Sequence, residues 1–358
     1  MTDTTSRPIG FWPSGIFTRA NRAKPSAPPT AVPLEIRTAL FRQHGSASQA
    51  YSATFQGGLQ HFGDERGFLA YKAVGSTALV LSDPLAPLQN ISDLISRFLQ
   101  RYPDTGFWYV SRPVAYILGD RGFFVNAMGP DTWIDLTSYN FNGPKKKPLR
   151  EAVNRMVKRG FVTRECTLDE IGIDKVKAVS DAWRQRRTIR HGEVCFLNRP
   201  LVLAEEPEIR RFFTFDRDGK LVAFGFFDPV YEGGELIGYT SQHNRHLPEA
   251  DCMVHFAIKR VAIETFQKEG LRVLHLGLSP FADVLSDEEF KSSRSWATSR
   301  YFNAAYKSWL FNRYIYPNKG IEAHRKVYRG AQRQNYYAFN RRPSLPRVLK
   351  LLRACNIV

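Results

Sequence analysis

The chain has 358 residues, which is enough for two domains of ordinary size. Hydrophobic residues make up 43% of it and charged residues 24%, so a buried core is expected and wholesale disorder is excluded. Lysine and arginine number 51 against 34 aspartates and glutamates. The resulting charge of +17 indicates a polyanionic partner such as nucleic acid, an anionic membrane or a phosphorylated substrate.

Four further classes of protein are disfavoured. No segment approaches the roughly 18 consecutive apolar residues of a membrane-spanning helix, and the first residues lack the basic and apolar regions of a secretory signal. The four cysteines are widely separated and predict neither a disulfide framework nor a zinc site. We therefore expect a cytoplasmic protein without a bound metal, and contact with the inner face of the membrane stays open.

In the first part of the chain, strands and helices alternate. Residues 1–34 are rich in proline, serine, threonine and alanine and predict a flexible leader, or alternatively an interfacial aromatic-basic anchor. The elements expected after it are a strand pair at 68–74 and 77–82 that ends at Asp83-Pro84, a helix at 92–101, a strand at 107–110, a helix at 114–119, and strands near 123–127 and 132–136.

The second part of the chain repeats this order. It predicts a strand pair at 221–227 and 236–241, a helix at 253–268 ended by Gly270, and a strand at 273–276. The two sets lie about 160 residues apart, a spacing that favours an internal duplication. We therefore expect two α/β domains of mixed sheets flanked by helices, at 35–165 and 166–340, and a basic tail at 341–358.

Two segments carry most of the positive charge. Residues 143–164 hold eight basic residues and one acid on a predicted amphipathic helix, which favours a phosphate-contacting surface over a merely solvated face. The last 58 residues hold twelve basic residues and one acid, with aromatic residues interleaved. That pattern suits RNA or lipid headgroups, or else core aromatics beneath a solvated basic surface.

The strand–loop–helix unit resembles the acetyltransferase (GNAT) fold, in which a glycine-rich loop and a helix start hold the pyrophosphate of coenzyme A. Neither copy here offers those glycines, and prolines remove backbone donors, so acetyl-coenzyme A binding is disfavoured. What remains is a predicted polar turn at 242–246. Its histidines and arginine suit a general base and a phosphate or oxyanion ligand, although a surface loop is often polar without any such role.

Several motifs together resemble the soluble C-terminal domain of bacterial phosphatidylglycerol lysyltransferases, the MprF family. In the first half they are residues 71–75 (YKAVG), 81–84 (LSDP), 133–136 (WIDL), 146–155 and 158–161. In the second half, residues 276–280 (LGLSP) are similar to that family's strand end, and residues 320–328 are similar to its closing element. The resemblance covers about residues 40–340.

The resemblance implies tandem GNAT-like domains, akin also to the Fem peptidyltransferases. It implies transfer of an amino acid from aminoacyl-tRNA to phosphatidylglycerol or a related hydroxyl or amine acceptor, with no cofactor. Arg245 matches a family arginine, but Gln242 stands where the family has an aspartate, and an amide is not a base. Either His243 or His246 replaces that aspartate, or the acceptor is an amine that needs little activation, or catalysis is weak.

The resemblance and the charge pattern together give the expected site residues. Catalysis is assigned to Arg245, His243, His246 and Gln242, and substrate binding to Arg325, Lys326, Tyr328 and Ser279. Contact with the tRNA backbone is assigned to Lys145, Lys146, Lys147, Arg150 and Arg155. An N-acyltransferase that uses an acyl-thioester, and a non-catalytic module that binds RNA or a membrane, remain as alternatives.

Overall fold

The computed structural model describes residues 31–187, 192–314, 316–341 and 344–357, so the predicted leader lies almost wholly outside the described residues. The strands within these ranges are β1 (Gln60–Asp64), β2 (Gly67–Val74), β3 (Thr77–Leu85), β4 (Thr105–Val110), β5 (Phe124–Asp135), β6 (Val162–Glu165), β7 (Arg210–Phe215), β8 (Leu221–Glu232), β9 (Glu235–His246), β10 (Val273–Leu278) and β11 (Ala331–Phe339).

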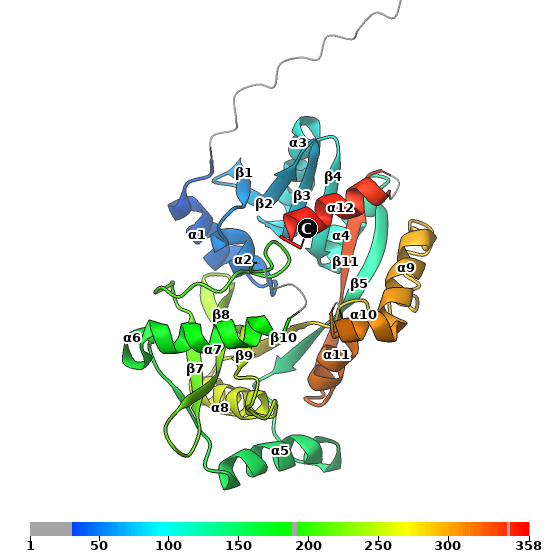
Figure 1. Ribbon diagram of the computed structural model, residues 1–358. Helices are drawn as coiled ribbons and strands as arrows, with labels where there is room; N and C mark the ends of the chain where they lie inside the picture. The colour runs from blue at the N-terminus through cyan, green and yellow to red at the C-terminus, as the bar shows by residue number, and fades with distance from the viewer. Residues whose placement is uncertain (1–30, 188–191, 315, 342–343, 358) are drawn as a thin grey trace, which may run out of the picture. The chain divides into compact units, whose positions relative to one another are not determined.

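Helices flank these strands on both sides of the sheet (Figure 1). They are α1 (Leu34–His44), α2 (Ala50–Phe55), α3 (Leu88–Arg101), α4 (Arg112–Gly119), the short 3-10 helix η1 (Pro144–Lys146), α5 (Lys147–Lys158), α6 (Leu168–Ile171), α7 (Ile173–Gln185), α8 (Val254–Lys268), α9 (Trp296–Lys307), α10 (Trp309–Tyr314), α11 (Asn318–Lys326) and α12 (Leu345–Ala354).

The strands form one mixed sheet in the order β1-β2-β3-β4-β11-β5-β10-β9-β8-β7-β6. The same unit occurs twice: an antiparallel hairpin, a crossover helix and a strand parallel to the hairpin's second strand. It is built from β2, β3, α3 and β4 in one half and from β8, β9, α8 and β10 in the other. The predicted α/β fold class with an internal repeat is therefore confirmed.

The two halves are joined by strand pairing. β5, in the first half of the chain, pairs with β10 of the second unit, and β11, which comes from near the end of the chain, lies between β4 and β5. The predicted boundaries at residues 165 and 340 stay a prediction, and in the continuous sheet the second half of the chain supplies β11 to the strands of the first half.

The longest strands of the second half are buried on both faces. All residues of β8 except Glu232 are buried, which is typical of a strand covered by helices on each side. The cover comes from α7 and α8, and α8 buries Ile258, Ile263 and Phe266 at helical spacing against the sheet. Gly270, at φ +76°, ends α8 as predicted.

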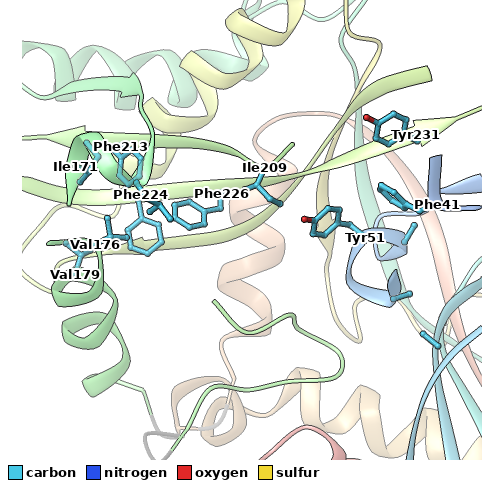
Figure 2. Close-up of a cluster of buried hydrophobic side chains, with 14 of the residues drawn as sticks. Phe41, Tyr51, Ile171, Val176, Val179, Ile209, Phe213, Phe224, Phe226 and Tyr231 are labelled. Atoms are coloured by element: carbon cyan, nitrogen blue, oxygen red, sulfur yellow. The ribbon is translucent and has the colours of Figure 1, made fainter. Parts of the chain in front are cut away.

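A second core connects the first two helices to β8. Figure 2 shows Phe41 of α1 and Tyr51 of α2 lying toward Tyr231 of β8, and the rings of Phe41 and Tyr231 meet edge to face at 5.4 Å. The same cluster continues along β8 through Phe226 and Phe224 to α7. Burial of this size fixes α1 and α2 against the second unit although they precede the first.

Three predicted elements were wrong in their bounds. β3 does not end at Asp83-Pro84 but continues to Leu85, because a bulge opposite Leu69 accommodates the proline. α3 begins at Leu88, directly after Pro87, rather than at Ser92. The two short strands expected at 123–136 are the single strand β5, which a bulge near Gly129 interrupts without ending it.

Candidate functional site

The parallel strands β9 and β10 separate toward their carboxyl ends. Their pairing runs only from Gly238–Val273 to Thr240–His275, whereas β9 continues to His246 and β10 to Leu278. In a sheet of this kind, ligands bind beyond the carboxyl ends of parallel strands, where the strands part. We call the region where residues 241–246 and 276–279 no longer pair with each other the wedge.

The residues expected to form a polar turn lie within β9, so that prediction was wrong. Phe227 pairs with Ser241 and Phe226 with His243, which leaves Gln242 as the extra residue of a β-bulge. Beyond the bulge, successive side chains of β9 point to opposite faces of the sheet. Asn244 and His246 contact α8, whereas Arg245 contacts α7.

Arg245 is not a free cation. Its guanidinium makes two hydrogen bonds to the Glu193 carboxylate, at 2.8 and 2.7 Å, donates a third to Ser180 Oγ at 2.6 Å, and stacks on Trp183. Only 4% of the residue is exposed. A pair of this geometry stabilises the packing of β9 against α7, and leaves little of Arg245 to bind a phosphate or an oxyanion.

His243 lies on the same side and is buried. Burial and the positive charges of Arg199 and Arg245 hold the pKa of His243 well below its usual value, so the ring is neutral. Its Nε2 atom has no hydrogen-bond partner among the described residues. Because Arg199 is itself bound to Asp228 and Glu206, His243 sits among structural ion pairs and away from α8.

The cation that enters the wedge is Arg325, near the end of α11. Its Nε donates to the carbonyl oxygen of Leu276 at 2.8 Å, and its Nη1 is buried without a partner among the described residues. Gly277 makes room for it: the glycine has φ +89°, and a Cβ atom there would lie 2.9 Å from Arg325 Nη2. The glycine of the LGLSP motif therefore has a physical reason, which is the passage of this side chain.

Lys259 of α8 is the second cation at the wedge. Its only side-chain hydrogen bond within the described part of the chain goes from Nζ to the neutral Oδ1 of Asn244 at 2.9 Å, and 4% of the residue is exposed. Burial first, and then the charge of Arg325, lowers the pKa of Lys259 to about 7. None of the described carboxylates forms an ion pair with Lys259 or Arg325, so the wedge holds positive charge that the described chain does not neutralise.

Three histidines surround these cations. His246 Nδ1 lies 2.9 Å from His255 Nε2, and His324 stacks on Phe256 at 4.5 Å between ring centroids. Burial, followed by the neighbouring cations, lowers the pKa of each of the three, and His255 Nδ1 has no partner within the described ranges. His255 Nδ1 is therefore a buried ring nitrogen within electrostatic range of Lys259 that could accept or donate a hydrogen bond.

One acid of the first half lies near Arg325. Asp131 of β5 accepts a hydrogen bond from Ser48 Oγ at 2.6 Å through Oδ2, while Oδ1 is buried and unpartnered among the described residues. Tyr109 of β4 is next to it, and burial together with Asp131 raises the pKa of that phenol. Arg325 therefore lies within electrostatic range of both halves of the sheet.

The other expected substrate ligands have different surroundings. Lys326 points outward and pairs with Glu322. Tyr328 is fully buried beneath Phe256 and its hydroxyl has no described partner. Ser279 is buried directly after β10, at the end of the wedge, where its backbone N–H donates to Pro130. Of the four, Arg325 enters the wedge and Ser279 borders it.

The basic segment forms η1 and α5, and its cations differ in how free they are. Arg150 Nη1 is used inside the loop, where it donates to the carbonyl oxygens of Phe141 and Gly143. Lys146 lies over the Tyr139 ring, and Lys147 pairs with Glu151. Lys145 and Arg155 are exposed. Two of the five predicted tRNA ligands thus also hold the loop together.

The corresponding wedge of the first half lacks cations among the described residues that line it. There, Asp83 Oδ1 accepts a hydrogen bond from the backbone N–H of Ser111, at the start of α4. Burial raises the pKa of Asp83. A cavity of about 310 Å³ lies beside these residues. The first half thus presents an acid where the second half presents two cations, so the two wedges are chemically unlike.

Comparison with known proteins adds to this geometry. A protein family described as phosphatidylglycerol lysyltransferase, C-terminal, matches residues 38–339. The chain belongs to this family. The resemblance seen in the sequence motifs is thus confirmed over most of the chain.

The individual relatives are distant in sequence. The phosphatidylglycerol lysyltransferase of Bacillus subtilis is 22% identical over 293 residues, which are 79% of this chain and 32% of that protein. The structure of L-PGS from Bacillus licheniformis covers 93% of this chain and 98% of its own, with 18% identity and a TM-score of 0.75. The C-terminal domain of a putative lysylphosphatidylglycerol synthetase from Agrobacterium fabrum covers 91% and 98%, with 18% identity and a TM-score of 0.71.

The chain therefore spans about a third of the length of the curated relative from Bacillus subtilis. At these identities the solved structures establish the shared fold. No helix within the described ranges is long and apolar enough to cross a bilayer.

Proposed function

We propose that the chain is an aminoacyltransferase, which moves an amino acid from aminoacyl-tRNA to phosphatidylglycerol or a related hydroxyl or amine acceptor. Membership of the lysyltransferase family supports this reaction class. The observation that carries the proposal is the wedge, in which the cations of Arg325 and Lys259 lie inside the fold without a described counter-ion. Buried charge is costly unless it is paired, so such a site fits an anionic substrate.

The reaction needs few protein groups. The acceptor hydroxyl oxygen bonds to the aminoacyl carbonyl carbon, and the ester bond from that carbon to the tRNA ribose oxygen breaks. One proton passes from the acceptor hydroxyl to the ribose oxygen. The starting ester is already activated, so the protein has to orient the substrates, stabilise the charge that develops on the carbonyl oxygen and relay the proton.

In this proposal Arg325 binds the negatively charged oxygens. Its unpartnered Nη1 is available to a phosphate of the acceptor or to the developing oxyanion, and its Nε bond to Leu276 fixes the plane of the guanidinium. Asp131, with one buried and unpartnered oxygen near Arg325, suits the α-ammonium group of the aminoacyl moiety. That assignment pairs the negatively charged oxygens at the reaction centre with Arg325 and the α-ammonium group with Asp131.

Lys259 is the group that we propose for the proton relay. With a pKa of about 7 it is partly neutral at physiological pH, as a general base must be. Gln242 cannot act as a base, His243 lies on the α7 side, and His246 is bound to His255. The charge of Arg325 helps to keep Lys259 deprotonated, so the two cations act together.

The same proposal implies two partners, which are aminoacyl-tRNA and an anionic phospholipid. Lys145 of η1 and Arg155 of α5 supply cations for the tRNA backbone, and phosphatidylglycerol as acceptor would bring the reaction to a membrane surface. We therefore propose peripheral contact with the inner face of the membrane. The N-acyltransferase alternative has less support, because the segment before α3 carries no glycine, and Pro84 and Pro87 remove backbone donors there.

A transfer assay tests the proposal. The full chain is incubated with tRNA charged with single labelled amino acids and with vesicles that contain phosphatidylglycerol, and the lipid extract is counted. We expect label in the lipid fraction that depends on protein and is lost when the tRNA is digested beforehand. No labelled product with any of the amino acids, from phosphatidylglycerol or from amine acceptors, would refute the proposal and favour a module that only binds.

A further inference from the structure

Helices α9 and α10 expose large apolar side chains to an extent that the rest of the described chain does not. Six of the fourteen large hydrophobic residues that are exposed in the described part of the chain fall within residues 296–316: Trp296, Tyr301, Trp309, Leu310, Tyr314 and Tyr316. Trp309 is 67% exposed and Leu310 61%. None of the described residues of α10 is buried, and packing among the described residues leaves most of Trp309 and Leu310 exposed.

Basic side chains accompany them on the same two helices. Arg300, Lys307 and Arg313 are exposed, and none of them forms an ion pair with a described carboxylate. In the sequence from residue 292 to residue 330 the only acid is Glu322, which is buried and bound to Tyr306 and Lys326. The surface is therefore both apolar and positively charged.

We propose that this surface, formed by the exposed residues of α9 and α10, docks on the headgroup layer of an anionic lipid bilayer. Tryptophan and tyrosine prefer the interface between water and hydrocarbon, leucine enters the acyl boundary, and lysine and arginine meet lipid phosphates. An RNA-binding surface would use the aromatic rings and the cations. It would have no use for the exposed Leu310, because an aliphatic side chain does not stack on a base.

The surface connects directly to the wedge. α11 follows α10 after three residues and carries Arg325, and Figure 1 shows α9, α10 and α11 as neighbouring helices. Docking through α9 and α10 would hold the Arg325 helix at the membrane, where a lipid acceptor is found. The choice of an anionic lipid rests on the proposed function, whereas the docking itself requires no catalysis.

Vesicle sedimentation without tRNA tests the docking. The full chain is mixed with vesicles of phosphatidylcholine alone or with phosphatidylglycerol added. We expect binding that requires phosphatidylglycerol and weakens with salt. The double substitution Trp309→Ala/Leu310→Ala should weaken it about tenfold or more. Leu88→Ala, on α3 and also 61% exposed, is the matched control and should bind as the unchanged protein does.

A triple substitution of Arg300, Lys307 and Arg313 to glutamine tests the charges. At about 1 kcal/mol for each cation near an anionic surface, we expect binding to fall on the order of 100-fold. Equal binding of phosphatidylcholine and phosphatidylglycerol vesicles, or no loss in either variant, would overturn the proposal. So would loss of tRNA binding with vesicle binding retained, because that result assigns the surface to RNA.

The outcome is separable from that of the proposed function. If the chain transfers no amino acid at all, vesicle binding still decides whether α9 and α10 dock. If it does transfer, the Trp309→Ala/Leu310→Ala variant should act normally on a water-soluble glycerophosphoglycerol acceptor and poorly on vesicles. Equal loss on both acceptors would contradict a docking role.

Discussion

Replacing Lys259 by methionine tests the electrostatics of the wedge. The pKa of Lys259 falls from its ordinary value of 10.5 to about 7 on folding. Between these two values the unfolded chain binds more protons than the folded one, so the folded state gains stability as the pH rises. From pH 7 to pH 10 this one group should change the free energy of unfolding by about 3 kcal/mol, which is less than the roughly 4 kcal/mol of the full slope of 1.36 kcal/mol for each pH unit, because the lysine is only partly titrated near each of the two pKa values.

Methionine has a similar length and no charge, so Lys259→Met should lose this dependence. We expect urea unfolding at pH 7, 8, 9 and 10 to show the variant as more stable than the unchanged protein near pH 7. That advantage should shrink by about 3 kcal/mol toward pH 10. Lys268→Met, on the exposed side of the same helix, is the control and should leave the pH dependence unchanged.

The same variant tests the proposed proton relay. The transfer rate of the unchanged protein should rise with pH through about 7 and then level off, because only neutral Lys259 accepts a proton. Lys259→Met should lose most of the rate and also this pH profile. If the free energy of unfolding changed with pH in the same way for the variant and the unchanged protein, the buried lysine of low pKa on which the reasoning depends would be refuted.

Three further predictions follow from individual contacts. Gly277→Ala, which places a Cβ against Arg325 at a positive φ, should cost about 1–3 kcal/mol in urea unfolding and lower transfer, whereas Gly320→Ala, where nothing lies within 4 Å, should do neither. Arg245→Gln should destabilise the fold by about 2–3 kcal/mol, and coupling with Glu193→Gln in a double-mutant cycle would show that it acts as an ion pair; zero coupling would contradict this. Lys145→Gln, Lys147→Gln and Arg155→Gln replace exposed cations of η1 and α5. The slope of log affinity for tRNA against log salt concentration should fall in magnitude by about 0.7–0.9 for each tRNA phosphate that the protein no longer neutralises. An unchanged slope would show that this segment does not contact tRNA.

The repeated strand–helix–strand unit could be predicted from the sequence because its signals are local. Buried strands such as β2 and β8 show as short apolar segments, and α8 shows as an apolar stripe ended by Gly270. The position of β11 between β4 and β5 could not be predicted. That pairing joins residues about 200 apart in the chain, and no local pattern encodes it.

The site was predictable only in part. Arg325 was found through the resemblance, but its burial depends on the contact with Gly277, which lies far away in the sequence. Lys259 was missed because a lysine in an amphipathic helix is ordinarily placed on the solvated face. Lys259 lies three residues after Phe256 and three residues before Ala262, and these two residues are partly buried and buried. That helical spacing was the available signal that Lys259 lies on the inward face of α8. The residues at 242–246 predict a turn by their polarity, which hides a strand whose bulge depends on its partner.

The most direct test of the account is a single-turnover measurement of label passing from aminoacyl-tRNA to phosphatidylglycerol, with Arg325→Gln compared with Arg329→Gln. Arg329 is a nearby exposed arginine and serves as the matched control. We predict that Arg325→Gln slows transfer by about 100-fold or more, as for loss of a preorganised oxyanion or phosphate ligand, and that Arg329→Gln leaves it nearly unchanged. A rate for Arg325→Gln equal to that of Arg329→Gln would contradict the assignment of the wedge as the site of transfer.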